Sequence, residues 1–219
     1  MPTPLFVFDA YGTLFDVHAA AGRHRDEIGP SYERLSQTWR AKHLEYTWIH
    51  AQTGRPIEFW TLTQRSLDYA ISATGGVPAG VREKLLAAYR KMAAFAEVPG
   101  ILAVLRSKGA RLAILSNGDP DMLDDAVSSA ELMGVFEAVL SVSAAGTFKP
   151  SMTVYQLVLD RMVGKPEDVT FLSSNRWDVA GAQVFGFKTV WVNRAGLPDE
   201  YPDMPAGRTV RDLNALIAD

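Results

Sequence analysis

The sequence predicts an α/β protein in which helices flank a parallel sheet and a helical block is inserted into the chain. Three observations indicate this fold class. Leu5 to Phe8 form a short apolar run that ends in Asp9, which is typical of a strand buried on both faces of a parallel sheet. Residues 16–96 show helical patterns and no strand pattern. From residue 97 onward, strand-like and helical segments alternate, which favours parallel strands joined by right-handed crossovers.

The inserted block is expected to be all-helical. It opens with a polar, Ala-rich stretch over residues 16–29, and helices are expected over residues 31–52, 57–73 and 81–95. Glycine- and proline-containing stretches separate the three helices, as helix ends require. We therefore expect two parts, an α/β core domain formed by residues 1–15 and 97–219, and a helical cap domain formed by residues 16–96.

The rest of the chain is expected to complete the core. Further strands are expected over residues 111–115, 138–142, 169–172 and 189–192. Helices are expected over residues 101–107, 121–130, 153–163, 177–185 and 211–217. Parallel strands place their carboxyl ends at one edge, which is where open α/β sheets bind ligands.

Composition excludes several classes of function. The chain has 219 residues, of which 47% are hydrophobic, enough for a sizeable core. The net charge is −3 and the 22 basic residues are scattered, so binding to nucleic acid is not indicated. The absence of cysteine excludes disulfides, thiolate metal sites and a cysteine nucleophile. The four histidines show no metal-binding spacing, and no metal site is expected.

The sequence gives no indication of a membrane partner. The first strand begins almost at the N-terminus, without a basic and apolar signal segment before it. No apolar run approaches the length of about 20 residues that a membrane-spanning helix needs. A soluble, cytoplasmic protein is expected.

Four of the loops that follow strands carry polar or charged residues, namely Asp9 with Thr13, Ser116 with Asn117, Lys149, and Ser173 with Asn175 and Asp178. Ordinary turns and helix caps use the same residue types, so each loop alone has a purely structural interpretation. Four such loops at one sheet edge favour a site. A strand-end carboxylate can act as a nucleophile, and Lys149 nearby would favour its ionised form.

These residues resemble the four motifs of the haloacid dehalogenase (HAD) superfamily. The resemblance rests on Asp9, Ser116, Lys149 and Asp178, and it covers essentially the whole chain, including a cap inserted after the first motif. It implies a Rossmann-like core. Most members of this superfamily are magnesium-dependent phosphatases with a second aspartate two residues after the first. Tyr11 occupies that position here, so the acid that protonates the phosphatase leaving group is missing.

A closer resemblance is to the L-2-haloacid dehalogenases. It is carried by Phe8–Leu14, by Trp39-Arg40 followed by Leu44–Trp48, by Leu115–Gly118, by Lys149-Pro150 with Tyr155, and by Ser173–Asp178. Two positions depart from the pattern. Ala41 stands where glutamine is expected, and Arg176 is unusual between Asn175 and Trp177. Both departures concern the preferred chain length of the substrate.

The resemblance implies a role for each matching residue. Asp9 would be the nucleophile, oriented by Lys149, and Thr13, Tyr155 and Ser173 would support the network. Arg40 and Asn117 would receive the halide, while Ser116 and backbone amides near Tyr11 would hold the substrate carboxylate. Asn175 and Asp178 would position or activate water. The apolar wall around the alkyl group would consist of Tyr11, Leu44, Phe59 and Trp177.

The implied reaction is the conversion of a short L-2-haloacid to a D-2-hydroxy acid and halide. A leaving halide needs hydrogen-bond donors and no proton, and Arg40 would supply a permanent cation with fixed donors. No cofactor is expected, and the resemblance implies a homodimer. Two alternatives are a HAD phosphatase and a non-catalytic carboxylate-binding HAD protein. Arg40 could also be a surface cation, and the aromatic residues could be plain core.

Overall fold

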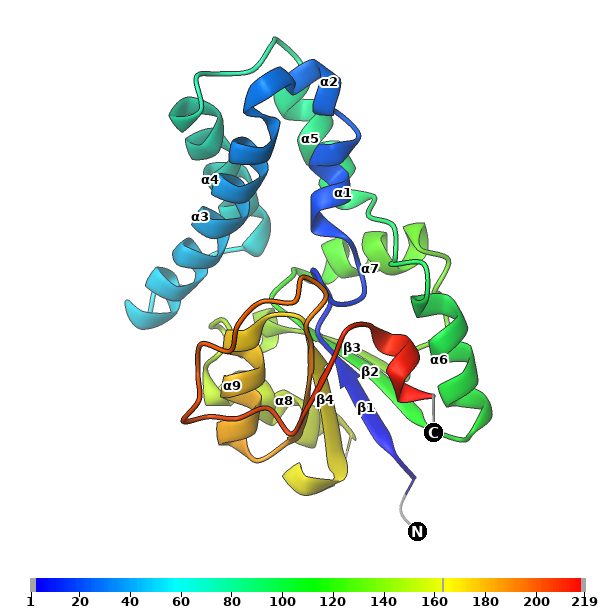
Figure 1. Ribbon diagram of the computed structural model, residues 1–219. Coiled ribbons are helices and arrows are strands. Elements are labelled where there is room, and N and C mark those ends of the chain that lie inside the picture. Colours follow the sequence, from blue (N-terminus) through cyan, green and yellow to red (C-terminus); the bar gives the residue numbers. More distant parts are fainter. Residues whose placement is uncertain (1–2, 163, 218–219) are drawn as a thin grey trace.

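The computed structural model describes residues 3–162 and 164–217 (Figure 1). Within these residues the strands form one six-stranded sheet in the order β3-β2-β1-β4-β5-β6. Every pairing is parallel. Because the sheet is parallel and helices connect its strands, the α/β fold class expected from the sequence is confirmed.

Strand β1 (Leu5–Phe8) lies in the middle of the sheet, between β2 (Arg111–Ser116) and β4 (Val169–Ser173). Its last residue, Phe8, is fully buried and pairs with residues of both neighbouring strands. The Asp9 amide continues the ladder by donating to the Leu172 carbonyl at 2.8 Å. The Asp9 side chain therefore projects from the carboxyl edge of the sheet at its centre.

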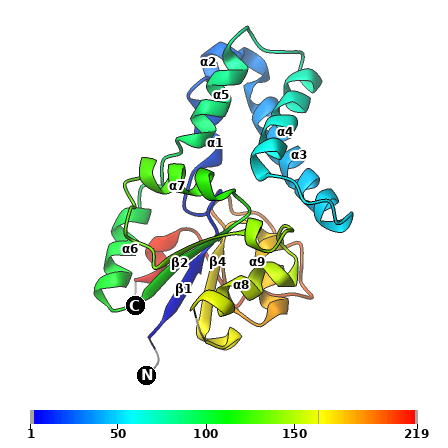
Figure 2. The same cartoon turned by 180° about the vertical axis from the view of Figure 1, so that it is seen from behind.

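The remaining strands are β3 (Ala138–Ser141), β5 (Lys188–Val192) and β6 (Arg208–Val210). Helices α6 (Val98–Ser107) and α7 (Pro120–Ser129) lie on one side of the sheet, and α8 (Met152–Met162) and α9 (Arg176–Phe185) lie on the other (Figures 1 and 2). Short 3-10 turns lie at Val142–Ala144 (η2) and Pro166–Asp168 (η3). The apolar side chains of the central strands are buried between these two layers.

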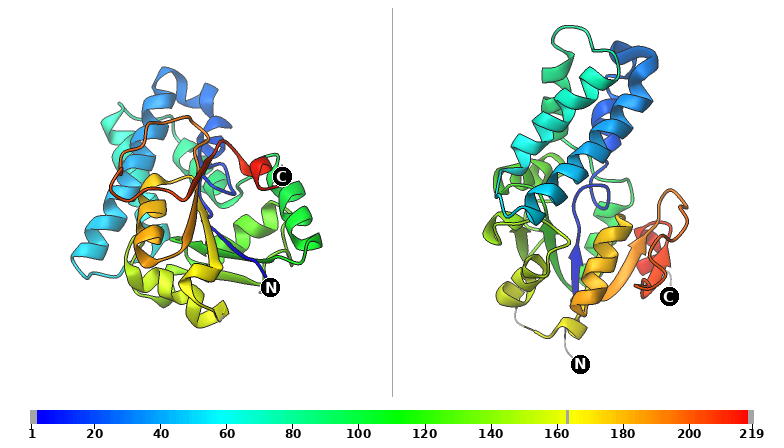
Figure 3. Two further views of the ribbon diagram at one scale, coloured as in Figure 1. Left: turned by 60° about the horizontal axis from the view of Figure 1, so that its bottom comes forward. Right: turned by 90° about the vertical axis from the view of Figure 1, so that its left-hand side faces the viewer.

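Five helices lie between β1 and α6 in the chain and project beyond the carboxyl edge of the sheet (Figures 1 and 3). They are α1 (Val17–Gly22), α2 (Arg25–Ile28), α3 (Tyr32–Gln52), α4 (Phe59–Ala73) and α5 (Val81–Arg90), with a 3-10 turn at Gly29–Ser31 (η1). We call α1–α5 the helical insert. The Trp39 indole nitrogen donates to the Thr63 carbonyl at 3.0 Å and joins α3 to α4.

The helix expected over residues 81–95 is too long, because α5 ends at Arg90. The following residues run back to the core beside the outgoing chain. The Asp16 amide donates to the Ala93 carbonyl at 3.1 Å, and the Phe95 amide donates to the Leu14 carbonyl at 3.0 Å. The two connections between insert and core thus hydrogen-bond to each other, which requires extended backbone in place of a last helical turn.

Two further expectations at the level of elements are wrong. The helix expected over residues 211–217 is a single 3-10 turn at Leu213–Leu216 (η4). The edge strand β6 was missed, because it has three residues and only Val210 is buried. The polar stretch 16–29 contains α1 and α2. Other element ends agree within three residues, except that the expected end at Val163 lies outside the described residues. No helix in the described part of the chain is both long and apolar enough to cross a membrane.

Candidate active site

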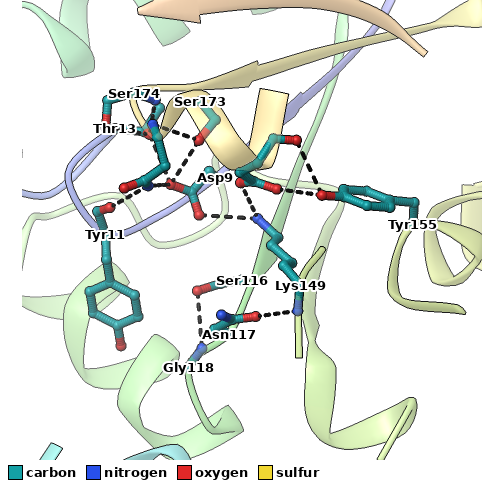
Figure 4. Close-up of polar contacts among 12 residues, drawn as sticks. Asp9, Tyr11, Thr13, Ser116, Asn117, Gly118, Lys149, Tyr155, Ser173 and Ser174 are labelled. Carbon is teal, nitrogen blue, oxygen red and sulfur yellow. Dashed lines mark hydrogen bonds and ion pairs between the residues drawn. The ribbon is translucent and has the colours of Figure 1, made fainter. Parts of the chain in front are cut away.

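Asp9 is the centre of a dense hydrogen-bond network (Figure 4). Its Oδ2 accepts from Thr13 Oγ1 at 2.9 Å, from Asn175 Nδ2 at 2.9 Å and from Ser173 Oγ at 3.3 Å. Its Oδ1 accepts from Lys149 Nζ at 3.1 Å. Only 5% of Asp9 is exposed, so these donors replace water around the carboxylate. Oδ2 accepts three of these hydrogen bonds and Oδ1 accepts one, so Oδ1 has more lone-pair capacity free.

Lys149 bridges the two buried carboxylates of the site. Its ammonium lies 3.1 Å from Asp9 Oδ1 and 2.9 Å from Asp178 Oδ2. Asp178 Oδ1 accepts from the Tyr155 hydroxyl at 2.8 Å. Lys149, Tyr155 and Asp178 are all fully buried. A chain of hydrogen bonds therefore runs from Tyr155 through Asp178 and Lys149 to Asp9, and one ammonium faces two carboxylates.

Burial and charge shift the pKa values in this chain. Burial raises the pKa of Asp178 to about 6, against the opposing effect of Lys149, because little water reaches the carboxylate. Burial also opposes the charged form of Lys149, yet the two carboxylates outweigh it and raise the pKa of the ammonium. Lys149 therefore remains a cation, and Asp178 becomes a stronger base than an exposed aspartate.

The loop after β1 is shaped around the loop after β4. The Ser174 amide donates to Thr13 Oγ1 at 2.8 Å, so the Thr13 hydroxyl is held where it reaches Asp9. Gly12 has a positive φ of 88°, and a Cβ there would lie 3.0 Å from Ser174 Oγ. Glycine at this position therefore allows both the left-handed backbone and the close approach of the two loops.

The loop after β2 brings Ser116 and Asn117 next to Lys149. Asn117 Oδ1 accepts from the Lys149 amide at 3.0 Å, and Ser116 Oγ accepts from the Gly118 amide at 3.1 Å. Gly118 leaves room for Tyr11, because a Cβ would lie 2.7 Å from the Tyr11 hydroxyl oxygen. Figure 4 shows Ser116, Asn117 and Gly118 on the side of Asp9 from which Lys149 approaches.

One cation reaches the network from the helical insert. Arg40 on α3 donates from Nη2 to Asn175 Oδ1 at 3.0 Å. The amide nitrogen of Asn175 donates to Asp9 Oδ2, so Asn175 connects insert and core through one side chain. A cleft of about 410 Å³ opens beside this contact, and its lining includes Gly12, Arg40, Ser174, Asn175 and Arg194. We call it the Arg40 cleft.

A cluster of aromatic rings packs around Tyr11. The Tyr11 ring stacks on Phe59 at 5.5 Å and on Tyr89 at 5.7 Å between centroids. The rings of buried His43 and Phe59 lie 4.2 Å apart between centroids, and burial lowers the pKa of His43 to about 3, so it is neutral. Tyr89 and His43 were missed as site residues, since on the sequence they are ordinary apolar-face positions of helices.

The two other expected wall residues lie on α3, which carries Arg40, and on α9, whose N-cap residue is Asn175. Leu44 is half-buried on α3, one turn after Arg40. Trp177 on α9 contacts Trp48 on α3 edge to face, with centroids 5.6 Å apart. Because Arg40, Leu44 and Trp48 are spaced four residues apart, they share one face of α3, which Arg40 and Trp48 place toward the core.

Within the described residues, neither of the two departures from the family pattern hydrogen-bonds to Asp9. Ala41 is exposed on α3. Arg176 is buried, and its guanidinium pairs with Asp199 at 2.7 Å and donates to the Tyr201 and Met204 carbonyls. Arg176 thus fixes the loop between β5 and β6, a contact that sequence spacing did not reveal.

No group of three or more His, Asp or Glu residues in the described ranges is placed to hold a metal ion. The space between Asp9 and Asp178 is instead taken by the Lys149 ammonium. The site therefore combines a restrained carboxylate, an internal ammonium, a guanidinium from the insert and an apolar wall. Such a set suits displacement at carbon by a carboxylate.

Comparisons with known proteins agree with this class. The family of haloacid dehalogenase-like hydrolases matches residues 3–186. The (S)-2-haloacid dehalogenase 1 of Pseudomonas sp. (strain CBS-3) is 39% identical over 216 residues, which is 98% of this chain and 95% of that protein. The chain belongs to the haloacid dehalogenase-like hydrolase family.

Two solved structures extend the comparison. A dehalogenase with an intermediate complex superimposes with a TM-score of 0.95 at 39% identity, covering 98% of this chain and 95% of the other. The L-2-haloacid dehalogenase from Xanthobacter autotrophicus with chloropropionic acid covalently bound gives a TM-score of 0.87 at 33% identity, covering 98% and 97%. The resemblance to L-2-haloacid dehalogenases expected from the sequence motifs is confirmed.

Proposed function

We propose that this protein is an enzyme that hydrolyses short L-2-haloacids to D-2-hydroxy acids and halide through an ester on Asp9. One observation carries the proposal. Asp9 is held by four side-chain donors at the sheet edge, while the position two residues later is Tyr11, which packs into the aromatic wall. The similarity to (S)-2-haloacid dehalogenases along nearly the whole chain supports it.

In the first step, an oxygen of Asp9 attacks the 2-carbon of the substrate from the side opposite the halogen. We assign the attack to Oδ1, because Oδ2 already accepts three hydrogen bonds and Oδ1 accepts one. The new C–O bond forms as the C–halogen bond breaks, and the electron pair leaves with the halide. Backside attack inverts the carbon. The covalently bound chloropropionic acid in the Xanthobacter autotrophicus structure supports an ester of this kind.

The leaving halide needs donors aimed at its position. Arg40 is a permanent cation that borders the Arg40 cleft and reaches Asn175, the direct neighbour of Asp9. Asn117 Oδ1 accepts from the Lys149 amide, and the N–H groups on Nδ2 are the donors that this side chain can offer to a halide. We assign both side chains to the halide. The proposal requires Arg40 to exchange its contact with Asn175 for the halide during the reaction.

Two sets of groups are assigned to orient the substrate, one for its carboxylate and one for its alkyl group. Ser116 and backbone amides near Tyr11 are assigned to the substrate carboxylate, because Ser116 ends β2 and Tyr11 follows β1 at the same sheet edge. The alkyl group is assigned to the wall formed by Tyr11, Leu44, Phe59 and Trp177. The carboxylate contacts fix the enantiomer, since exchanging hydrogen and halogen at the 2-carbon would direct the halide away from Arg40.

In the second step, water attacks the carboxyl carbon of the Asp9 ester. We assign its positioning to Asn175 and its deprotonation to Asp178, whose raised pKa makes it a suitable base near neutral pH. The ester C–O bond on the Asp9 side breaks, the hydroxy acid takes a proton, and the Asp9 carboxylate forms again. Thr13, Tyr155 and Ser173 hold the groups in place throughout.

We propose that residues 1–15 and 97–219 form the core domain and that residues 16–96 form a cap domain over its site. The hydrogen-bonded connections near residues 14–16 and 93–95 would be the hinge. The protein is further proposed to act without a metal or other cofactor, as a cytoplasmic homodimer. Light scattering after size-exclusion chromatography tests the dimer.

Release of chloride from L-2-chloropropionate, with the D enantiomer in a parallel assay, tests the proposed function. Strong preference for the L form is expected. Hydrolysis of phosphate esters that requires magnesium, with no halide release, would place the protein among the phosphatases. Binding of haloacid without halide release would favour a non-catalytic carboxylate-binding protein.

A further inference from the structure

The N-terminus of α4 is capped by a residue from a distant part of the chain. The Phe59 amide donates to Asp119 Oδ1 at 3.1 Å, and the Trp60 amide donates to Asp119 Oδ2 at 2.7 Å. Both oxygens of one carboxylate therefore serve the first turn of α4, where backbone N–H groups have no partners within the helix. Asp119 lies in the core, in the loop between β2 and α7, and is 9% exposed.

In the described residues, neither α4 nor α7 is capped by the side chain of its own N-cap residue. Asp119 occupies the N-cap position of α7, yet its side chain makes no capping bond to α7 within the described chain. Glu58 occupies the N-cap position of α4 and likewise makes none in the described residues. Aspartate is a strong capping residue and a negative charge is favourable at a helix N-terminus. Asp119 caps α4 of the helical insert instead of α7, and its negative charge lies at the N-terminus of α4.

This contact sets the position of one wall residue of the site. The ring of Phe59 stacks on Tyr11 and lies against His43. Asp119 follows Gly118, whose missing side chain gives Tyr11 its space. A single carboxylate therefore fixes the backbone of Phe59 relative to the loop that carries Ser116 and Asn117.

We propose that Asp119 is a positioning residue that holds Phe59 over the site and thereby sets the preference for the alkyl group at the 2-carbon of the substrate. The proposal rests on the function proposed above. Asp119 acts through the backbone of Phe59 and need not touch the reacting atoms. A displaced Phe59 ring would leave the alkyl group poorly packed and the halide and carboxylate contacts intact.

The chain provides a matched control for this contact. Asp121 is two residues away, and it also joins core to insert, since its carboxylate pairs with Arg90 on α5 at 2.7 Å. That pair is a side-chain contact with a 66% exposed aspartate. Exposed ion pairs contribute little to stability, whereas a lost helix cap leaves backbone donors unpaired. Asp119→Ala and Asp121→Ala therefore remove the same group from two different kinds of contact.

The first experiment does not depend on enzymatic activity. Amide hydrogen exchange is followed residue by residue in the full-length protein and in Asp119→Ala, Asp119→Asn and Asp121→Ala. In Asp119→Ala the Phe59 and Trp60 amides should exchange about five- to tenfold faster, as expected for loss of a helix cap. Amides of β1 should not change, which shows that the core is folded. Asp119→Asn keeps one acceptor and should lie between Asp119→Ala and the unsubstituted protein.

The second experiment measures kcat/KM for L-2-chloropropionate and for chloroacetate, which lacks the methyl group. In Asp119→Ala the ratio of the two values should fall about tenfold, the discrimination that one methyl group in a pocket provides. Asp121→Ala should leave the ratio unchanged, and Asp119→Asn should restore part of it. A purely structural role would lower both values equally.

Unchanged exchange at Phe59 and Trp60 in Asp119→Ala would overturn the proposal, because another group would then hold these amides. Faster exchange with an unchanged substrate ratio would also overturn it, since Asp119 would cap α4 without setting specificity. If the unsubstituted protein releases halide from neither acid, the proposed function fails, and the specificity assigned to Asp119 fails with it. The exchange measurement then still decides whether Asp119 holds Phe59.

Discussion

Arg40 and Asn175 lie 135 residues apart in the chain, and Arg40 Nη2 lies 3.0 Å from Asn175 Oδ1. The side-chain nitrogen of Asn175, Nδ2, donates to Asp9 Oδ2 at 2.9 Å, so Asn175 contacts both Arg40 and Asp9. A guanidinium on the helical insert is thereby linked to the carboxylate at the centre of the sheet. In the proposed reaction Arg40 exchanges this contact for the halide, so the insert supplies one leaving-group donor beside the nucleophile of the core.

Arg40→Ala should lower halide release about 100-fold or more, the effect expected for losing a donor placed where charge develops. It also removes the donor that holds Asn175. Arg34 is an exposed arginine on the same helix, so Arg34→Ala is the control and should retain normal activity. Steady-state halide release, with thermal unfolding to verify the fold, makes the comparison. Near-normal turnover by folded Arg40→Ala would remove Arg40 from the halide site.

Gly118→Ala should disturb the site through Tyr11. The added Cβ would lie 2.7 Å from the Tyr11 hydroxyl oxygen and 2.8 Å from its ring, so the ring must leave its present position. Because any displacement of the Tyr11 ring misplaces the pocket wall, we expect kcat/KM for L-2-chloropropionate to fall about tenfold. Gly100→Ala is the control, because nothing lies within 4 Å of a Cβ at that position. Equal activity of the two variants would contradict the packing described for Tyr11.

The activity should decline in acid as Asp178 takes up a proton. Its pKa is raised from the ordinary 3.8 to about 6, mainly by burial, so its function as a base is present above about pH 6 and lost below it. The effect on folding has the opposite sign. The stability that Asp178 contributes is fully present below its unfolded pKa of about 4 and is lost as pH rises through about 6.

The pH profile of kcat separates Asp178 from histidine. His18 lines the Arg40 cleft, and burial lowers its pKa, so it titrates below its usual range. His18→Asn should therefore keep the acid limb near pH 6. Loss of this limb in His18→Asn, with Asp178 unchanged, would assign the ionisation to His18.

Removal of divalent metals should leave halide release unchanged. The motivation is Tyr11 two residues after Asp9, together with the Lys149 ammonium that bridges Asp9 and Asp178. Dialysis against EDTA, followed by assay with and without added magnesium, provides the test. A collapse of activity that magnesium restores would be incompatible with the proposed chemistry.

The fold could be predicted largely because its signals are local. The apolar run before Asp9 and the alternation of strands and helices placed the strand ends at one edge, and the predicted residues Asp9, Thr13, Lys149, Ser173, Asn175 and Asp178 lie there in contact. The three-residue strand β6 is too short to give a pattern, and the end of α5 depends on pairing between two distant connections.

Two contacts that depend on side-chain direction could not be predicted. Asp119 was not singled out in the sequence. It occupies the N-cap position of α7, where aspartate is an ordinary cap, and only the structure shows its carboxylate turned to α4. Arg176 likewise follows two proposed site residues, yet its guanidinium holds the loop at Asp199. Spacing along the chain fixes which residues are near a site, and packing decides which of them face it.

The central claim is that Asp9 itself forms the bond to the substrate. A single turnover of L-2-chloropropionate in heavy-oxygen water, with enzyme in excess, tests it most directly. We expect the label on the peptide that contains Asp9 and a first product, D-lactate, that is nearly unlabelled, because the product oxygen comes from Asp9 and water replaces it on the enzyme. Label that enters the hydroxy acid directly, with none on that peptide, would mean that water attacks the substrate and Asp9 is only a base.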